Sequence, residues 1–428
     1  MRASSLLGPV VAVALALGAG CGGTKAEPFR IGILADCYGP FGSLHEPIVA
    51  SAELPLVERG GRARGGQPTN DIQGVEVAGR PIELLQGCVA GNEEVIPEAR
   101  RLVEEEGAQA IVGPIDPQQG TILRQYAGRR PQTAFLIQPS AATQVTMAGR
   151  APNVFRFAPD SAQWAAGAGA YAYRDLGWRT AAIVGDDVPF SWEQAAGFIA
   201  EFCALGGRIV DRRWVAVGTD PAGVVPALPG TAGGVFLAPA VSPELGFVKR
   251  YAIRHPDLSR RLVSTASLLY DPTVLPVAHG VVVAGPLPFA PTARLRAYVA
   301  AFSKAFPTIP PAIAVGPITV AYRDGVEALL EALDRTGGAG GTKLLEALAR
   351  VRLNSPTGEL RLDRDRQAIV SSYLSRVGRD AEGKPVIATL RVVPNVEQTF
   401  GGYFKPSDPP PSRTSPVCRK ATPAPWTR

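Results

Sequence analysis

TAFLIQPSAAT, residues 133–143, joins a short apolar run to a series of small residues. Ala134 to Ile137 predict a buried strand, because an uninterrupted apolar run of this length is typical of a strand covered on both faces. The strand gives way to small and hydroxyl-bearing residues: Pro139, Ser140, Ala141, Ala142 and Thr143. Such side chains suit a place where a neighbouring chain segment, a loop turn or a ligand approaches the backbone.

Apolar runs of the same kind recur on both sides of this stretch, with helical patterns between them. The predicted strands are 29–36, 81–87, 108–114, 180–186, 208–217, 233–239 and 261–266. The predicted helices between them are 95–107, 120–130, 161–177, 192–207 and 243–256. Continuous apolar strands separated by amphipathic helices imply an α/β fold with parallel sheets covered on both faces.

Two extended, proline-bounded segments interrupt the alternation, at 154–159 and 281–289. Each follows about four strand–helix units, which suits a crossing between two lobes. Helices at 292–307 and 318–338 return to the first lobe, and a third crossing is expected near Asn354–Gly358. The predicted division is lobe 1 at 29–157 and 285–354, lobe 2 at 158–284 and 355–403, and a proline-rich tail at 404–428, flexible or draped over the surface.

Composition supports a globular protein of two domains. The chain has 428 residues, of which 46% are apolar and 19% charged. Its 44 basic and 38 acidic residues are spread thinly, with no lysine or arginine block. The charge pattern therefore predicts no nucleic-acid binding.

The N-terminus has the pattern of an export signal. Arg2 precedes an apolar stretch from Leu6 to Ala19, too short to span a bilayer comfortably, and small residues lead to Cys21. This arrangement resembles a bacterial lipoprotein signal, although Gly18 stands where leucine is usual. The resemblance implies a signal peptide at 1–20, lipidation of Cys21 and a tether at 21–28. A plain cleaved signal is the alternative.

Four more cysteines follow, and export permits disulfides. Cys37 and Cys88 each end a predicted strand, and two neighbouring parallel strands would bring them within bonding distance. Cys203 and Cys418 pair by elimination. We expect no metal site, because the cysteine spacings are wide and only His45, His255 and His279 could assist.

Eight short motifs occur in an order and spacing that resemble a known family. They are YGPFG (38–42), IVGP (111–114), PSAAT (139–143), NVFRFAPDSAQ (153–163), LGWRTAAIVGDD (176–187), SPELG (242–246), AYRDGVEALLEAL (321–333) and SPTGELRLDRD (355–365). From about Phe29 to Val393 the chain resembles the type I periplasmic solute-binding proteins, in particular the branched-chain amino-acid and amide-binding lipoproteins of ABC importers. The resemblance implies two Rossmann-like α/β lobes with parallel central sheets, joined by three hinge strands and closing over a ligand.

The resemblance also implies a ligand site beyond the carboxyl ends of the strands. Ala141 and Thr143 match the positions that hold an amino-acid ligand, and an ordinary strand-to-loop turn is the alternative. Tyr38 and Phe41 could stack on the ligand or pack within their loop, and Phe190, Ser191 and Trp192 stand where relatives face it. The predicted ligand-binding residues are Tyr38, Phe41, Asp116, Gln118, Ser140, Ala141, Thr143, Phe190, Trp192, Val241 and Ser267.

Three departures from the family pattern leave the substrate open. The loop after IVGP reads Ile115 to Gln119, without serine or threonine, and Val241 replaces a tyrosine. The acidic partner of a ligand ammonium falls near Ala266, so Asp116 would have to supply that charge or the ligand is not a free α-amino acid. Asp186 and Asp187 are expected to cap the following helix, with acid–base chemistry as the alternative.

Three functions are compatible with the sequence. The first is a lipid-anchored receptor that captures a small polar ligand (an amino acid, amide or relative) and delivers it to an ABC permease and ATPase. It would act as a monomer outside the cytoplasmic membrane, without a cofactor. An exported enzyme is disfavoured, because no GxSxG elbow, phosphate loop or zinc motif occurs. A sensor or envelope interaction protein on the same scaffold is the third.

Overall fold

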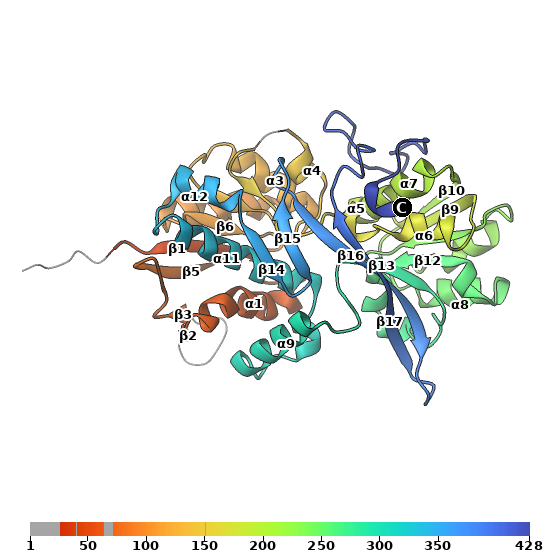
Figure 1. Cartoon of the computed structure of the whole chain (residues 1–428), viewed down its shortest axis with the longest axis horizontal. Coiled ribbons are helices and arrows are strands. Elements are labelled where there is room, and N and C mark those ends of the chain that lie inside the picture. The colour runs from red at the N-terminus through yellow and green to blue at the C-terminus, as the bar shows by residue number, and fades with distance from the viewer. Residues whose placement is uncertain (1–25, 40, 64–71, 150) are drawn as a thin grey trace, which may run out of the picture.

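The computed structural model of the chain describes residues 26–39, 41–63, 72–149 and 151–428. Two lobes lie side by side, each built on its own central sheet (Figure 1). This arrangement confirms the predicted α/β fold with two Rossmann-like lobes. The predicted signal peptide and Cys21 lie outside the described residues.

The sheet of the first lobe has the strand order β4-β5-β1-β6-β7-β8, parallel except for the β4–β5 pair. Its strands are β1 (Phe29–Asp36), β4 (Glu76–Val77), β5 (Arg80–Val89), β6 (Ala110–Val112), β7 (Ala134–Leu136) and β8 (Val154–Phe155). Ile31 and Leu34 of β1 belong to different core clusters, so this sheet is buried on both faces, as its apolar runs predicted.

The helices of this lobe include two groups distant in sequence. They are α1 (His45–Glu58), α2 (Val95–Arg100), α3 (Pro117–Ala127) and α4 (Gln144–Met147), then α9 (Ala293–Ala305), α10 (Pro311–Ala314), α11 (Pro317–Arg335) and α12 (Gly341–Leu348). A π-helical turn, Arg101–Glu105, extends α2, and β2 (Arg62–Ala63) pairs with β3 (Ile72–Gln73). Arg59, the residue directly after α1, forms an ion pair with Glu327 of α11, which ties the two groups together.

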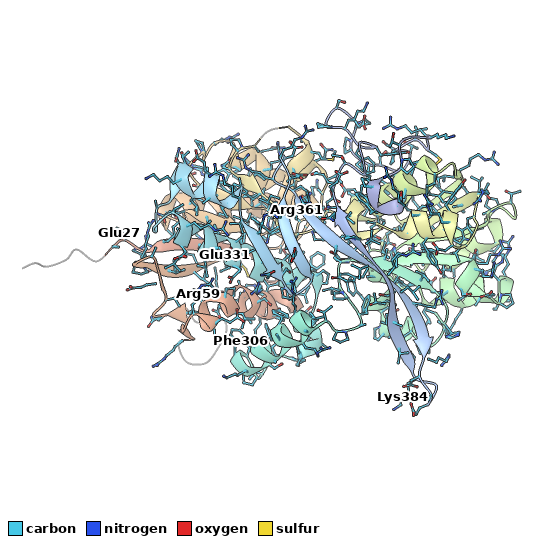
Figure 2. The ribbon with its side chains drawn as sticks, viewed as in Figure 1. Glu27, Arg59, Phe306, Glu331, Arg361 and Lys384 are labelled. Atoms are coloured by element: carbon cyan, nitrogen blue, oxygen red, sulfur yellow. A yellow bond between two sulfur atoms is a disulfide. The ribbon has the colours of Figure 1, made fainter. Side chains whose placement is uncertain are left out.

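The second sheet has the order β10-β9-β11-β12-β13-β16-β15-β14, and β17 also pairs with β16. Its parallel strands are β9 (Thr180–Asp186), β10 (Arg208–Val215), β11 (Gly234–Ala238), β12 (Leu262–Thr265) and β13 (Val282–Gly285). Antiparallel strands follow: β14 (Arg352–Ser355), β15 (Gly358–Leu362), β16 (Ala368–Arg379) and β17 (Pro385–Val396). Lys384 lies at the projecting tip of the β16–β17 hairpin (Figure 2).

The helices of the second lobe are α5 (Ser161–Trp164), α6 (Ala168–Arg174), α7 (Pro189–Ala204) and α8 (Leu245–Arg254). The single helix predicted over 161–177 is wrong, because the chain breaks at Gly167 between α5 and α6. Gly167 has φ 90°, and a Cβ there would lie 2.7 Å from Val393. A left-handed residue under this close approach has to be glycine.

The chain passes between the lobes after β8, after β13 and along the β15–β16 region. At the first pass Arg156 bridges to Gln367 of the third. The sequence placed the third pass near Asn354–Gly358, but Ser355 and Gly358 pair with each other at the turn of the β14–β15 hairpin. The pass lies further along, where Ala368 donates its N–H to the Arg156 carbonyl.

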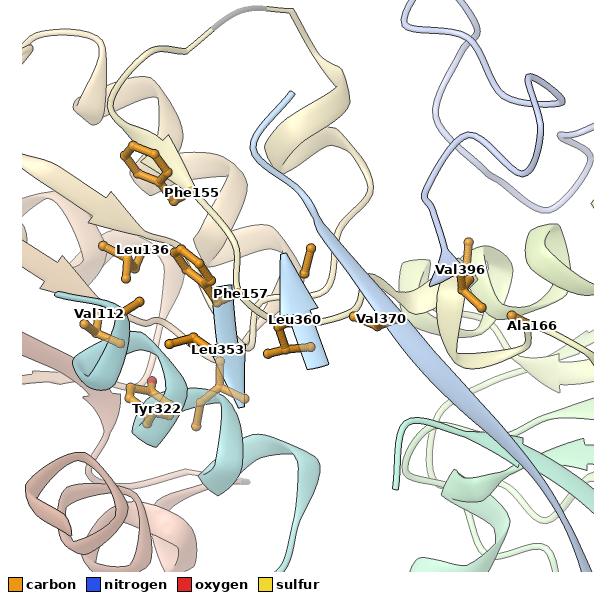
Figure 3. Close-up of a cluster of buried hydrophobic side chains, with 14 of the residues drawn as sticks. Val112, Leu136, Phe155, Phe157, Ala166, Tyr322, Leu353, Leu360, Val370 and Val396 are labelled. Atoms are coloured by element: carbon orange, nitrogen blue, oxygen red, sulfur yellow. The ribbon is translucent and has the colours of Figure 1, made fainter. Parts of the chain in front are cut away.

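One hydrophobic cluster runs continuously through the passes (Figure 3). It contains Val112 and Leu136 of the first sheet, Phe157 and Val370 of the passing segments, and Val396 at the end of β17. The lobes therefore share apolar core at the passes.

Both predicted disulfides are present, Cys37–Cys88 and Cys203–Cys418. The first joins the carboxyl ends of β1 and β5, which pair as neighbouring parallel strands. The second fastens the tail to α7. The indole Nε1 of Trp426 also donates to Glu201 of α7, at 2.7 Å. The tail is thus draped over lobe 2.

Candidate functional site

The predicted ligand residues follow strand ends of both sheets. In lobe 1 these are the segments after β1, β6 and β7, and in lobe 2 those after β9, β11 and β12. Parallel strands place such segments at one edge of each sheet. Direct hydrogen bonds between the segment after β7 and helices α5 and α7 bring the two edges together.

Ser140, Ala141 and Thr143 are all buried at the end of β7. The Ser140 hydroxyl donates to the Asp116 carbonyl at 3.0 Å, within lobe 1. The Ala141 carbonyl accepts from the N–H and hydroxyl of Ser161, at 2.9 and 3.0 Å. Thr143 donates through its N–H and its hydroxyl to Glu193 Oε1, at 3.1 and 3.2 Å. The small residues of this segment therefore admit polar groups from the other lobe.

The first turns of α7 carry five consecutive residues of this region, four of which contact different neighbours. Phe190 packs edge-on against Trp164, with ring centroids 5.3 Å apart, and Trp192 lies under the Arg413 guanidinium. Glu193 reaches Thr143, and Gln194 Nε2 donates to the Ser267 hydroxyl at 3.4 Å. The fifth, Ser191, is fully buried. Phe190, Trp192 and Ser267 of the predicted set thus gather around α7.

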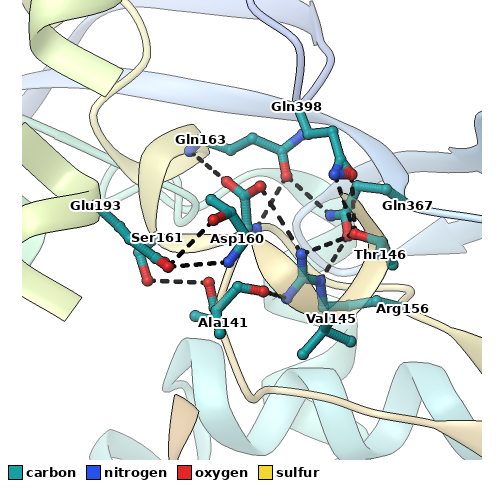
Figure 4. Close-up of polar contacts among 12 residues, drawn as sticks. Ala141, Val145, Thr146, Arg156, Asp160, Ser161, Gln163, Glu193, Gln367 and Gln398 are labelled. Carbon is teal, nitrogen blue, oxygen red and sulfur yellow. Dashed lines mark hydrogen bonds and ion pairs between the residues drawn. The ribbon is translucent and has the colours of Figure 1, made fainter. Parts of the chain in front are cut away.

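A buried polar network lies beside this contact (Figure 4). Arg156, fully buried, donates to the carbonyls of Ser140 and Ala142, at 2.9 and 2.6 Å, and to Gln367 Oε1 at 2.5 Å. Thr146 accepts from Arg156 and donates to Gln398, so the segment after β17 joins the network. The network links lobe 1 to the first and third passes and to the segment after β17.

Two carboxyl groups of this region are shifted upward in pKa. Burial, reinforced by the charge of Asp160, raises the pKa of Glu193 to about 8. Burial raises the pKa of Asp160 to about 6, against the nearby Arg156 charge. Perturbed carboxyls of this kind concentrate at functional sites.

Asp116 begins helix α3. Its Oδ1 accepts from the N–H groups of Gln118 and Gln119, at 2.7 and 3.1 Å, as an N-cap residue does. The Gln118 side chain is exposed. Asp36, at the end of β1, is buried, and its pKa is raised to about 7 by burial and by the charges of Asp116 and Glu94.

Tyr38 and Phe41 follow β1 but have local neighbours. The Tyr38 ring is 55% exposed, and its hydroxyl donates to Glu94 Oε1 at 2.7 Å. Phe41 is half-buried against the core of lobe 1. The packing of Phe41 is compatible with the loop-packing alternative, and its contact with a ligand stays a prediction.

The predicted capping role of Asp186 and Asp187 is wrong. Val188, without a side-chain cap, precedes α7. Asp186 Oδ2 instead accepts from three consecutive N–H groups, those of Ala240, Val241 and Ser242, at 2.9 to 3.2 Å. Asp187 forms an ion pair with Arg413. The Val241 side chain itself is 59% exposed.

Several buried polar atoms at the two edges have no hydrogen-bond partner among the described residues. They are Asp36 Oδ1, Gln119 Oε1, Ser191 Oγ, Trp192 Nε1 and Glu193 Oε2. Buried polar groups are normally satisfied, so atoms of this kind point to a water or ligand. The sequence analysis missed Asp36, Gln119 and Glu193. A signal for Glu193 existed: Glu193 and Glu201 are the two charged residues of a mostly apolar helix, eight residues apart.

Comparisons with known proteins agree with this architecture. A family described as "Periplasmic binding protein" matches residues 28–384. An ABC transporter substrate-binding protein from Sphaerobacter thermophilus is similar, with 25% identity, a TM-score of 0.75 and coverage of 86% of this chain and 98% of the other. None of the curated proteins matches.

Two further similar structures hold ligands. A solute-binding protein of an ABC transporter from Rhodopseudomonas palustris, in complex with p-hydroxybenzoic acid, has 18% identity, a TM-score of 0.73 and coverage of 86% and 98%. The branched-chain amino-acid binding protein of Streptococcus pneumoniae, in complex with isoleucine, has 14% identity, a TM-score of 0.64 and coverage of 85% and 99%. Within the described residues, the helices lack the combined length and apolar character needed to cross a bilayer. By the match over most of its length, the chain belongs to the periplasmic binding protein family.

Proposed function

We propose that this protein captures a small organic ligand between its lobes and delivers it to an ABC permease, without catalysis. The observation that carries the proposal is the Thr143–Glu193 contact, which joins strand-end segments of the two sheets. Unpartnered buried polar atoms lie at the same edges, on α3 and α7. Convergent polar groups at a junction of two lobes are typical of a ligand site.

Hinge motion about the three passes supplies the mechanism. The lobes close over the ligand, and the permease recognises the closed form. Phe190 and Trp192 offer aromatic surface for an apolar or planar part of the ligand. The ligands of the similar proteins, p-hydroxybenzoic acid and isoleucine, fit this class in size. Lipidation of Cys21 would hold the protein at the outer face of the cytoplasmic membrane, where it acts as a monomer.

A thermal-shift screen tests the proposal. The mature chain is heated with amino acids, amides, polyamines and aromatic acids, and a true ligand at a hundred times its Kd stabilises the protein by about 2.7 kcal/mol. Trp192→Ala should reduce the shift, whereas Trp214→Ala, a substitution on β10, should preserve it. If no compound class stabilises the protein, capture of a small organic ligand is refuted.

The tail supports a second candidate, a ligand sensor or envelope interaction protein. Residues 405–428 lie outside the matched family region and are fastened to lobe 2 by Cys203–Cys418. Affinity purification with a ligand present separates the two candidates. Recovery of a permease supports transport, and recovery of a signalling protein supports sensing.

A further inference from the structure

The Glu193 carboxyl group accepts the hydrogen bonds that Thr143 donates at the end of β7. Two donors of Thr143, its N–H and its hydroxyl, converge on Glu193 Oε1, at 3.1 and 3.2 Å. Convergent N–H and O–H donors at the end of a parallel strand would suit a ligand carboxylate. Here the carboxyl group of the protein's own α7 accepts from them.

The contact joins the two lobes and is closed to solvent. Thr143 and Glu193 are 2% and 3% exposed. Thr143 follows β7 of the first sheet, whereas Glu193 belongs to the helix that follows β9 of the second. An incoming carboxylate would have to displace Glu193 before it could reach the Thr143 donors.

The other oxygen of Glu193 has unused hydrogen-bonding capacity. Glu193 Oε2 is buried without a partner among the described residues. Arg156, the nearby cation, gives its hydrogen bonds to backbone carbonyls, Thr146 and Gln367. A hydrogen-bond donor at Oε2 would satisfy it, whereas an anionic ligand group would meet the like charge of Glu193 at low dielectric whenever Glu193 is ionised.

We propose that Glu193 sets the charge of the ligand: it reserves the Thr143 donors and favours a neutral amide or a cation over a carboxylate. This inference rests on the proposed function and narrows its ligand class. It separates this chain from the similar proteins whose bound ligands are p-hydroxybenzoic acid and isoleucine.

Matched acid and amide pairs provide the test, namely benzoate with benzamide and isovalerate with isovaleramide. Calorimetry on the mature chain at about pH 9, where Glu193 is ionised, should give an amide affinity about tenfold above that of the acid. Glu193→Gln should narrow this preference at least about tenfold, because it removes the internal charge. Glu201→Gln alters a buried carboxyl of the same helix and should leave the preference unchanged.

If Glu193→Gln folds poorly, the pH dependence of the wild-type amide preference provides a separate test. The charged and titratable groups near Glu193 are Asp160 before α5 and Arg156 at the first pass. Protonation of Glu193 between about pH 9 and about pH 6 should weaken the wild-type amide preference. The preference of Glu201→Gln should follow the same pH dependence.

The outcomes separate the two proposals. A wild-type preference for the acids that Glu193→Gln and pH leave unchanged overturns the role of Glu193 alone. Amide preference that is independent of pH and of Glu193→Gln overturns it as well. Failure of every pair and every compound of the thermal-shift screen to bind wild type or either variant overturns the proposed function, and the inference with it.

Discussion

Asp187 and Arg413, 226 residues apart in the chain, form a two-point ion pair with Nε 2.6 Å from Oδ1. The pair holds the tail against the segment between β9 and α7, and it places the guanidinium 5.8 Å from the Trp192 ring centroid. The tail therefore reaches the segment in which the sequence placed ligand contacts. Cys203–Cys418 fixes its position further along.

Removal of the Asp187 carboxylate should free this part of the tail. The pair is partly exposed, so Asp187→Ala should lower the free energy of unfolding by less than about 1 kcal/mol. Trypsin cleavage after Arg413 should nevertheless accelerate several-fold, measured by mass spectrometry of the non-reduced protein. Asp365→Ala removes a comparable exposed pair with Arg364 and should leave that rate unchanged. Equal cleavage of wild type and Asp187→Ala would show that the ion pair does not hold the tail.

Asp116 allows capping and ligand binding to be separated. Asp116→Ala should lower the free energy of unfolding by about 1 kcal/mol, because the N–H groups of Gln118 and Gln119 lose their acceptor. Asp116→Asn retains an acceptor and should restore most of this stability, measured by urea denaturation. If Asp116 also contacts a cationic ligand, Asp116→Asn should reduce its affinity while remaining stable. A stable Asn variant with unchanged affinity removes Asp116 from the site.

Much of the fold was predictable, because a parallel strand covered on both faces appears in the sequence as a continuous apolar run. The apolar runs around Ile31, Ile183 and Phe236 each form a strand with both faces covered. Cys37 and Cys88 were predictable for the same reason, since both follow from the ends of neighbouring strands. Local patterns of this kind can be recognised in the sequence without knowledge of tertiary contacts.

The site was less accessible, because its polar groups find partners far away in the sequence. No sequence pattern near Glu193 indicates that its hydrogen-bond partner is Thr143, 50 residues earlier. Asp186 likewise has the sequence position of a helix cap, although its Oδ2 accepts hydrogen bonds from the segment after β11. Gly167 breaks a helical pattern because Val393 of a distant strand packs on it. Each error concerns a long-range contact that local propensity does not encode.

Arg156 should be the least replaceable charged residue of the passes. Arg156→Lys keeps the charge but cannot reproduce the guanidinium fork that bonds Ser140, Ala142 and Gln367 together. Because two carbonyls and the Gln367 amide oxygen stay buried without their donors, we expect a loss of about 3 kcal/mol in the free energy of unfolding. Urea denaturation measures it. Arg364→Lys, at an 83% exposed side chain, is the control and should change little. A loss below about 1 kcal/mol would contradict the central role of Arg156.

Loss of the proton from Glu244 should lower the free energy of unfolding as the pH rises. Glu244 is buried, and burial with the charges of Asp186, Asp220 and Asp271 raises its pKa to about 8. The folded state therefore binds a proton that the unfolded state has already released above its ordinary pKa of about 4.5. The stability contributed by this proton is full below about pH 4.5 and is lost as the pH rises to about 8.

Glu244→Gln should remove this dependence, because glutamine does not titrate. Relative to wild type, the variant should gain stability steadily between about pH 5 and about pH 8, with a shift of one pKa unit worth about 1.4 kcal/mol. Thermal unfolding across that range gives the difference at each pH. Glu359→Gln, at a carboxyl whose side chain is 81% exposed, provides the control and should show a flat difference. A flat difference for Glu244→Gln as well would mean that its carboxyl titrates alike in the folded and unfolded states, and that the surrounding aspartates do not act on it.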